Sequence, residues 1–544
     1  MNVADTFPAA SPLASIRESP LGPLAIPEFR LLWTSGLGVN LALWMQAVGA
    51  AWLMLSLAPS PLMVASIQTA QSLPIFLFGL PGGVLADVID RRALILFSYA
   101  WFTVCVGIAS LLTFTGDMTP ALLLVVTAAL GASYALLAPA MQKSYVEAVP
   151  PHHLFAALSL GAVSFNSARA IGPALAGVIV STAGTVALFA TCALFALAAF
   201  VATLRWKHVA QPSDLPPEPM LVGVRGALQY ARHSPVMRAQ LLRTLIYVAA
   251  ASGLWALLPI VARDRLALGA GGYRLLLGCM GAGAVIGALL AVALRRRWSL
   301  NKLGMTSALS YTVGVAVVAT SPNLVAICIA LGFAGAGWAV VGNVNLTAIQ
   351  TAIPPWVRAR AMALYLLVFQ GAMAVGGIVW GAAASRWTLE AALLASVVAL
   401  AASMALMRAL PARMGDPSES TPSEPAGLPS FQVAPGQADG PLAVQVNYVI
   451  RMQDREQFLE VMQALGRSRK RDGALFWRIY RDLGHPQRYA ERFIVRSWSD
   501  YLRQRSRATE ADRHVEEQAR SLHVGPATPE MQHMLAERMP GEGG

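Results

Sequence analysis

The stretch Gly82-Gly83-Val84-Leu85-Ala86-Asp87-Val88-Ile89-Asp90-Arg91-Arg92 separates two long apolar runs, 62–86 and 93–115. An apolar run of about 20 residues has the length that a helix needs to cross a bilayer. A charged turn between two such runs predicts a pair of membrane-spanning helices that meet at the membrane surface.

The same pattern of apolar runs and short polar breaks continues on both sides of this stretch. The whole chain of 544 residues is 56% hydrophobic and only 13% charged, which excludes a simple soluble enzyme. We therefore expect an all-α polytopic membrane domain of about twelve helices. The other ten predicted spans are 29–57, 119–142, 157–181, 184–205, 239–262, 274–294, 302–320, 323–346, 361–385 and 389–409.

The composition changes sharply near Pro441. The 104 residues from there on carry 17 Lys and Arg and 14 Asp and Glu, whereas the first 440 residues carry only 24 and 15. Alternating apolar residues in 441–535 predict strands, and a β-α-β-β-α order indicates a small ferredoxin-like α+β domain. No clear fourth strand follows Leu522, so we expect an open sheet edge and possible self-association.

Other segments complete the predicted domain organisation. Residues 1–28 are rich in proline and predict a disordered lead-in, 206–238 form a long loop between two six-helix halves (29–205 and 239–410), and 411–440 form a linker. The four cysteines all lie within apolar runs, so no disulfide framework, metal site or cofactor is expected. We assign no nucleic-acid role to the net charge of +12, because basic loops are usual in membrane proteins.

Basic residues fall mostly at alternate ends of the predicted spans. Because Lys and Arg near a helix end resist translocation, this bias predicts a multi-pass protein of the cell inner membrane with both termini in the cytoplasm. Only four basic residues are expected on the outer side: Arg263, Arg265, Arg274 and Arg386.

An internal repeat relates the two halves. Pro150-Pro151 and Pro354-Pro355 are separated by 204 residues. At the same separation Phe165 aligns with Phe369, Asn166 with Gln370, Gly172 with Gly376, and Gly177 with Gly381. Two related halves predict a transporter that binds its substrate between them, near the bilayer midplane.

Polar residues inside the predicted spans are candidates for this substrate cavity. Arg169 is the most informative, because a charge in the middle of an apolar span is costly and marks a functional site or a structural pair. The others can serve either substrate contact or helix packing. The full candidate set is Asn40, Trp44, Gln46, Tyr134, Asn166, Arg169, Asn343, Asn345 and Gln370.

Charged residues at the predicted cytoplasmic ends are candidates for a gate. The pseudo-twofold axis predicts that Asp87 faces Arg358 and Arg360, and that Glu147 faces Arg295 and Arg296. The remaining gate candidates are Gly83, Arg91 and Arg92.

The stretch from Gly82 to Arg92 resembles the signature loop of the major facilitator superfamily, in which Gly permits close helix contact and the Asp and Arg cluster latches the halves. Val88 and Asp90 depart from that pattern. The fifth span, with Gly172-Pro173 and Gly177 at helix-packing positions, resembles in degraded form the glycine-rich motif of antiporters.

The whole chain resembles the enterobactin-exporter-like, transmembrane secretion effector branch of this superfamily. The residues that carry this resemblance are Phe29 to Trp33, Trp44 to Gln46, Asn166, Arg169, Gly172-Pro173, and the tail segments Arg471 to Ala474 and Trp477 to Asp482. It implies export of a siderophore-like or drug-like small molecule, driven by an ion gradient that is expected to be a proton gradient.

Two other functions stay open. One is a membrane-anchored enzyme whose tail resembles the monooxygenase-like, dimeric αβ-barrel group in topology, with Trp477, Tyr480 and His485 around a pocket. The other is a non-transporting sensor. No catalytic residue is assigned, and a Walker-type phosphate loop is absent from the sequence, which argues against ATP-driven transport.

Overall fold

A computed structural model describes residues 21–58, 60–206, 228–412, 435–437, 439–525 and 528–537, and the single residues 418, 421 and 423. The side chains of residues 84, 87, 88, 151, 155, 170, 270, 271, 355, 356 and 358–360 lie outside the described set. The predicted gate residues Asp87, Arg358 and Arg360 belong to this second group, so their predicted pairing lies outside the described side chains.

The first half consists of helices that begin mostly at proline, whose fixed φ suits the first helical turn. Two helices also have a side-chain cap at their N-terminus. The Asp90 side chain accepts a hydrogen bond from the Ala93 amide, and the Thr119 side chain accepts one from the Leu122 amide. The elements are η1 (Gly22–Ala25), α2 (Pro27–Leu57), α3 (Pro61–Val88), α4 (Arg91–Thr115), α5 (Pro120–Glu147), η2 (Pro151–His153) and α6 (Leu154–Leu204).

Helix α6 contains two membrane spans. Gly184 within it has φ 82° and ψ 176°, a backbone conformation that glycine adopts readily. The 51-residue helix therefore turns at Gly184, and its arms correspond to the predicted spans 157–181 and 184–205. Among the described residues, 11 helices are long and apolar enough to cross a membrane, and dividing α6 gives the twelve spans that the sequence predicts.

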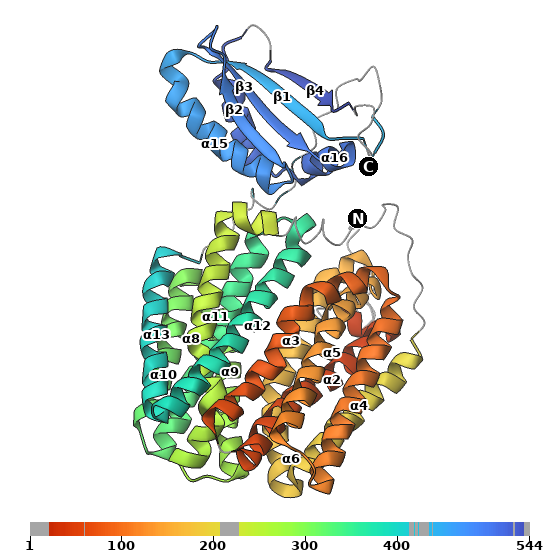
Figure 1. Cartoon of the computed structure of the whole chain (residues 1–544), viewed down its shortest axis with the longest axis vertical. Coiled ribbons are helices and arrows are strands. Elements are labelled where there is room, and N and C mark those ends of the chain that lie inside the picture. Colours follow the sequence, from red (N-terminus) through yellow and green to blue (C-terminus); the bar gives the residue numbers. More distant parts are fainter. Residues whose placement is uncertain are drawn as a thin grey trace, which may run out of the picture. The chain divides into compact units, whose positions relative to one another are not determined.

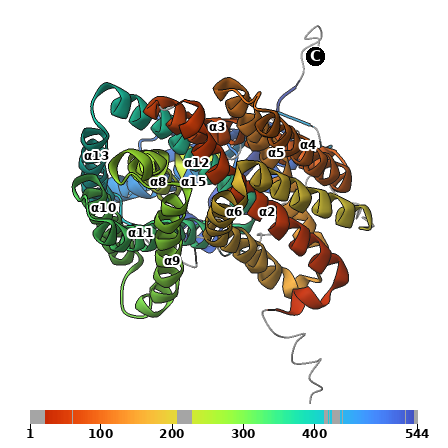
Figure 2. The same cartoon turned by 90° about the horizontal axis from the view of Figure 1, so that it is seen from below.

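The second half repeats this arrangement. Its elements are α8 (Pro235–Ile260), the π-helical turn η3 (Val261–Arg265), α9 (Ala270–Leu294), α10 (Leu300–Thr320), α11 (Leu324–Ala352), α12 (Pro355–Arg386) and α13 (Leu389–Ala409). Figure 1 shows α2–α6 and α8–α13 as two separate helix groups, and Figure 2 shows α6 beside α9 and α3 near α12.

The C-terminal domain is an antiparallel sheet with strand order β2-β3-β1-β4. Alternate side chains of β1 are buried against the helices, and the core contains Val446, Tyr448, Phe458, Met462 and Leu465. The elements are β1 (Leu442–Val449), η4 (Met452–Asp454), α15 (Arg455–Arg471), β2 (Phe476–Arg481), β3 (Arg488–Val495), α16 (Trp498–Arg507), α17 (Glu510–Ser521) and β4 (Glu530–Leu535).

Three sequence predictions are corrected here. A fourth strand exists, because β4 pairs with β1 from Leu442↔Leu535 to Asn447↔Glu530, so β2 and β4 are the edge strands of the sheet within the described residues. Residues 22–28 are structured, since η1 and the start of α2 lie within the predicted disordered lead-in; residues 1–20 lie outside the described set. The predicted loop 206–238 is helical at 228–233 and again from Pro235.

Candidate functional site

Glycines form the two seams along which the halves meet. A Cβ placed on Gly177 of α6 would lie 2.3 Å from Arg274 Cβ of α9, and one on Gly381 of α12 would lie 2.6 Å from Ala65 Cβ of α3. Both distances are too short for any side chain. Because these glycines are equivalent in the internal repeat, the seams α6–α9 and α12–α3 obey the same pseudo-twofold symmetry.

The preceding glycines of the repeat pack inside each half. A Cβ on Gly172 would lie 2.8 Å from Trp44 Cβ of α2, and one on Gly376 would lie 1.9 Å from Ser252 Oγ of α8. Gly172 and Gly177 thus both lie at close helix contacts, and Pro173 lies between them inside α6.

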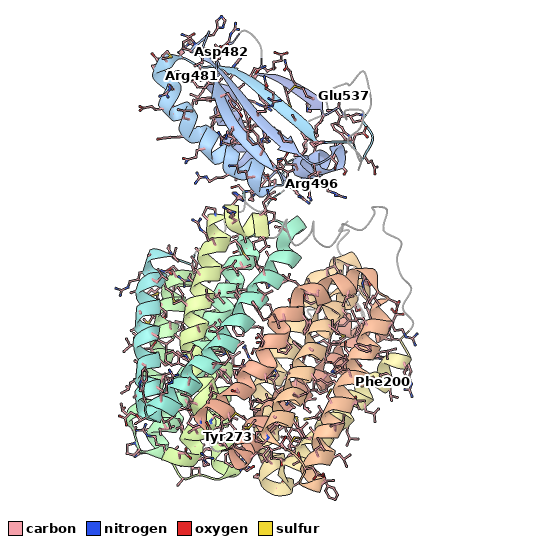
Figure 3. The ribbon with its side chains drawn as sticks, viewed as in Figure 1. Phe200, Tyr273, Arg481, Asp482, Arg496 and Glu537 are labelled. Atoms are coloured by element: carbon pink, nitrogen blue, oxygen red, sulfur yellow. The ribbon has the colours of Figure 1, made fainter. Side chains whose placement is uncertain are left out.

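A set of contacts closes one end of the bundle across the halves. Arg263 Nη1 donates to the Leu55 carbonyl at 2.8 Å, and the Leu62 amide donates to Ser385 Oγ at 3.0 Å. The Trp52 and Tyr273 rings stack with centroids 5.7 Å apart and an interplanar angle of 17°. Figure 3 labels Tyr273 at this end, where the two helix groups meet. We call this set the outer closure.

Three of the four basic residues expected on the outer side are involved at this end. Arg263 is held by Asp264 and reaches the other half, while Arg274 donates to Ser181 Oγ across the α6–α9 seam at 3.3 Å. Arg265 donates to the Ala319 carbonyl within its own half. Sequence reasoning used these residues only for topology and missed their contacts.

Replacing Arg263 with alanine is expected to weaken the outer closure. One hydrogen bond from a charged group contributes about 1.5 kcal/mol, so its loss shifts a two-state equilibrium about tenfold toward the open form. Maleimide labelling of Leu62→Cys, in a chain whose native cysteines are replaced by serine, would then be faster. Phe114→Cys, which lies on an exposed position of α4, should label at one rate in both backgrounds. Equal labelling of Leu62→Cys with and without Arg263 would refute this role.

Two polar candidates of the first half tie helices together. Asn40 Nδ2 of α2 donates to Ser164 Oγ of α6 at 3.3 Å, and the buried Gln46 donates to Thr127 Oγ1 of α5 at 3.4 Å. Asn166 is exposed and donates to the Ala162 carbonyl of its own helix at 2.9 Å. Its amide therefore does not connect Arg169 to a neighbouring helix.

Arg169 lies where the two halves approach each other. Its half-buried guanidinium interacts electrostatically with Tyr365 of α12. On the same helix, the Phe165 ring contacts Trp44 and Tyr134, with centroids 5.9 and 6.4 Å apart. The structure thus brings two sequence candidates, Trp44 and Tyr134, around Phe165, which lies one helical turn before Arg169 on α6.

The candidates of the second half have different environments. Asn343 is exposed and Gln370 is half-buried. Asn345 is buried, and its Oδ1 has no hydrogen-bond partner in the described part of the chain. Among these three, the exposed fraction favours Asn343 and Gln370 as groups that a solute can reach.

An aromatic cluster in the second half was missed by the sequence reasoning. Trp338 of α11 lies at its centre, with ring centroids 5.7–6.2 Å from those of Tyr247, Trp255, Tyr311 and Phe369. Phe369 also contacts Tyr365 at 6.5 Å. No motif marks these residues, because an aromatic residue in an apolar span reads as ordinary core or lipid-facing surface.

The predicted gate is only partly described, and its described pairs lie within the first half. Glu147 pairs with Arg91 in this conformation, and the predicted pairing of Glu147 with Arg295 and Arg296 stays a prediction. Arg295 and Arg296 are exposed. Arg92 donates to the Leu204 carbonyl at 2.8 Å, so both basic residues of the signature stretch fasten neighbouring helices of their own half.

The glycines of the signature stretch have separate roles. A Cβ on Gly82 would lie 2.5 Å from the Ala135 carbonyl oxygen of α5, whereas one on Gly83 would meet nothing within 4 Å. The Gly83 carbonyl instead accepts a bond from Lys143 Nζ at 3.3 Å. Close helix contact therefore depends on Gly82 and not on Gly83.

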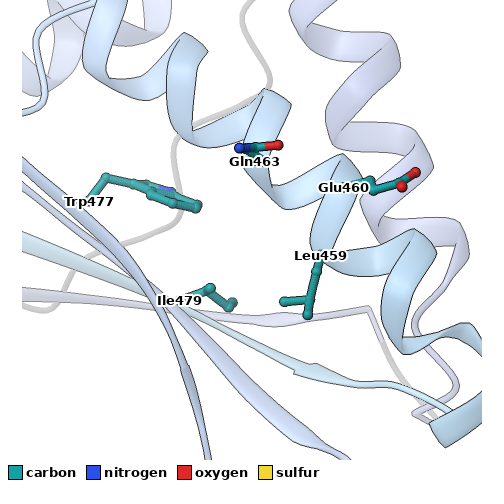
Figure 4. Close-up of a pocket in the computed structure, with 5 residues that line it drawn as sticks. All are labelled: Leu459, Glu460, Gln463, Trp477 and Ile479. Atoms are coloured by element: carbon teal, nitrogen blue, oxygen red, sulfur yellow. The ribbon is translucent and has the colours of Figure 1, made fainter.

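The C-terminal domain has a pocket of about 370 Å³ between α15 and β2. Figure 4 shows its lining side chains, Leu459, Glu460, Gln463, Trp477 and Ile479. Trp477 Nε1 donates to the buried Glu491 at 3.0 Å. Tyr480 and His485 are exposed and do not line this pocket, so the three residues suggested for an oxygenase do not form one site.

Buried charges around the end of α15 are paired. Arg469 bonds Glu491 and Glu516, and Arg471 bonds Asp472 and Asp512. Burial raises the pKa of Asp472 to about 6, against the opposing effect of Arg471. These pairs join α15 to β3 and α17, and so stabilise the fold of the domain.

The segment before α8 contacts the C-terminal domain. Gln229 Nε2 donates to the carbonyls of Lys470 and Ala474 at 2.8 and 2.9 Å. The last carbonyls of a helix have no partner within the helix, and Gln229 supplies one at the end of α15. The described parts of 218–242, 345–364 and 410–544 accordingly form one compact unit.

Comparisons with known proteins agree with this architecture. A family model described as a transmembrane secretion effector matches residues 18–540. The multidrug efflux pump Tap of Mycolicibacterium fortuitum is 24% identical over 387 residues, which are 69% of this chain and 92% of that protein.

Solved transporter structures share the fold of the helical part. The nucleoside transporter NupG matches 70% of this chain and 99% of its own, with a TM-score of 0.56 and 13% identity. A bacterial homologue of the human lysosomal transporter Spinster, in an inward-facing and occupied conformation, matches 70% of this chain and 96% of its own, with a TM-score of 0.57 and 13% identity. Both confirm the predicted fold class.

Proposed function

Since the chain belongs to the transmembrane secretion effector family, it is a multi-pass membrane transporter and not an enzyme, and we propose that it exports a siderophore-like or drug-like small molecule. Export proceeds by alternating access across the bacterial cytoplasmic membrane, coupled to protons. The similar protein Tap is named as a multidrug efflux pump, which supports efflux as the direction of transport.

The observation that carries this proposal is the outer closure together with the group around Arg169. With both termini in the cytoplasm, as the basic residues favour, the Arg263–Leu55 contact lies on the external side. The conformation described here is then closed to the outside. Arg169 and Tyr365, which lie deeper in the bundle on α6 and α12, are placed to meet a solute that enters from the cytoplasm.

Coupling to protons rests on carboxylates at the helix ends. Glu147 pairs with Arg91 at the cytoplasmic end of α5, and Asp264 pairs with Arg263 at the outer closure. Protonation of either carboxylate removes the attraction within its pair. Each pair sits beside a segment that has to move when the opening changes sides.

The test is transport by the purified full-length chain in inside-out vesicles. Uptake of a drug-like dye that depends on an imposed pH gradient, and that stops when the gradient is collapsed, supports a proton-coupled exporter. Dye uptake that persists without any ion gradient contradicts the coupling. A correctly inserted chain that moves no dye or siderophore under any gradient would favour a sensor.

The C-terminal domain is proposed to be a separately folding cytoplasmic module that modulates the transporter and can self-associate. Residues 441–544 expressed alone should be soluble and show the circular dichroism of a mixed α and β fold, because the sheet and its helices bury their own core. The free edges of β2 and β4 provide the surface for self-association.

The matching truncation checks this division of the chain. A chain that ends near residue 416 should insert and keep part of its export activity. An unfolded isolated domain, or a truncated chain that inserts correctly but exports nothing, would show that the two parts form one functional unit.

A further inference from the structure

The internal repeat relates two aromatic pairs, one in each half. Tyr134 and Trp338 are separated by 204 residues, as are Phe165 and Phe369. The rings of Tyr134 and Phe165 lie 6.4 Å apart, and those of Trp338 and Phe369 lie 5.9 Å apart. The same type of ring contact therefore occurs at equivalent places on both sides of the pseudo-twofold axis.

Each pair has one member on α6 or α12. Phe165 lies four residues before Arg169 on α6, and Phe369 lies four residues after Tyr365 on α12, so each is on the same helix face as its neighbour. Arg169 on α6 is within electrostatic range of Tyr365 on α12, whose ring lies 6.5 Å from that of Phe369. Each phenylalanine is thus about one helical turn away from a residue of this cross-half electrostatic pair.

Each aromatic pair has a tryptophan beside it. The Trp44 ring lies 5.9 Å from Phe165, and the Trp255 ring lies 5.7 Å from Trp338. Both indole N–H groups are buried, and neither has a hydrogen-bond partner within the described residues.

Other tryptophans of the bundle show that this is not a general property of the helices. Trp33 Nε1 donates to the Leu160 carbonyl and Trp380 Nε1 to the Ala249 carbonyl, both at 2.8 Å. A buried donor without a partner is costly, and such a group in a native structure calls for a specific explanation such as a bound molecule. Two such donors beside matched aromatic pairs point to a ligand that carries acceptor atoms.

We propose that the exported molecule is an aromatic compound rich in hydrogen-bond acceptors, and that Trp44 and Trp255 donate their indole N–H groups to it. Its ring system lies between the Tyr134–Phe165 and Trp338–Phe369 pairs, and its acceptor-bearing or anionic side faces Arg169. Aromatic rings supply stacking surface and Arg169 supplies positive charge, so a planar cation is disfavoured. The assignment rests on the proposed export function and specifies its substrate class.

Binding of two planar dyes to the full-length chain in lipid nanodiscs tests the proposal. Fluorescein is anionic and carries carboxylate and phenolate acceptors, whereas ethidium is a cation with amine donors. Fluorescence anisotropy should give tighter binding of fluorescein. Trp44→Phe and Trp255→Phe keep a ring but remove the N–H, and each should raise the Kd for fluorescein about tenfold, with little change for ethidium.

Trp380→Phe is the matched control, because its N–H is already satisfied by a backbone carbonyl. It should lower the thermal unfolding temperature and leave the Kd for fluorescein unchanged. Thermal unfolding of Trp44→Phe and Trp255→Phe identifies any variant that is merely misfolded, and a variant that unfolds early is replaced by Arg169→Gln, which should also weaken fluorescein binding.

The outcomes separate this inference from the export function. Preference for ethidium, absence of fluorescein binding, or an unchanged Kd in both tryptophan variants overturns the substrate class, even if vesicles carrying the protein still export a dye. The same preparation could instead bind fluorescein normally, with a dependence on both N–H groups, and export no dye. That result would support the binding site and contradict the proposed export function.

Discussion

Arg169→Ala is expected to abolish export while the protein still reaches the membrane in near-normal amount. The guanidinium is half-buried between the halves and interacts with Tyr365 of α12. A charge at this depth has to face protein, water or ligand, because contact with lipid is too costly. Removing it takes away the positive charge that an acceptor-rich solute would meet. Initial rates of dye uptake into inside-out vesicles, normalised to the amount of inserted protein, measure the effect.

Arg169→Lys is the companion variant, since it keeps the charge but loses the planar fork of donors. It should retain part of the activity. Wild-type transport by Arg169→Ala would remove Arg169 from the transport path. A failure of Arg169→Ala to accumulate in the membrane would indicate a structural role.

Gly177→Ala should also stop transport, for a steric reason. The new methyl group would lie 2.3 Å from Arg274 Cβ and 3.0 Å from Arg274 Cα, so rotating the Arg274 side chain cannot relieve the clash. The α6–α9 seam would be forced apart, and the outer closure could not form. We expect transport at the background level and an increased population of the outward-open form.

Gly107→Ala makes a close control for this change. It places the same methyl group within α4, where a Cβ meets nothing within 4 Å, and replacing glycine by alanine within a helix gains about 1 kcal/mol. Export should therefore be normal and stability slightly higher. Normal export by Gly177→Ala would mean that the seam can separate without loss of closure.

The positions of the membrane helices could be predicted from the sequence because the bilayer imposes its own length scale. An apolar run of about 20 residues has few alternatives to a spanning helix. The repeat added information about packing: Gly172 and Gly376 pack within their halves, and Gly177 and Gly381 pack between them. Aligning the two halves of the sequence thus identified glycines at two kinds of helix contact, one within a half and one between the halves.

The outer closure could not be predicted in the same way. Arg263 donates to the Leu55 backbone carbonyl, an acceptor that every residue type provides. Trp52 and Tyr273 are far apart in sequence and belong to different halves. The charge bias of the helix ends explains why basic residues are rare on the expected outer side. It gives no reason for the few that are present there, such as Arg263.

Strand β4 was missed for a different reason. Its sequence, Glu-Met-Gln-His-Met-Leu, has no β-branched or aromatic residue, so its intrinsic preference for a strand is weak. Pairing with β1 over six positions, Leu442 to Asn447, defines it instead. The orphan indoles of Trp44 and Trp255 are likewise invisible in sequence, since only the three-dimensional surroundings decide whether a donor finds an acceptor.

The turn at Gly184 limits how this protein can be tagged. The two arms of α6 meet at Gly184 with helical residues directly on both sides, so an epitope or protease site inserted at 184 would displace the ends of both spans. The turn at Gly116, by contrast, is followed by three non-helical residues before α5, and Asp117 within it is exposed. Reporter insertions that test which side of the membrane this end of the bundle faces therefore belong at 116–119.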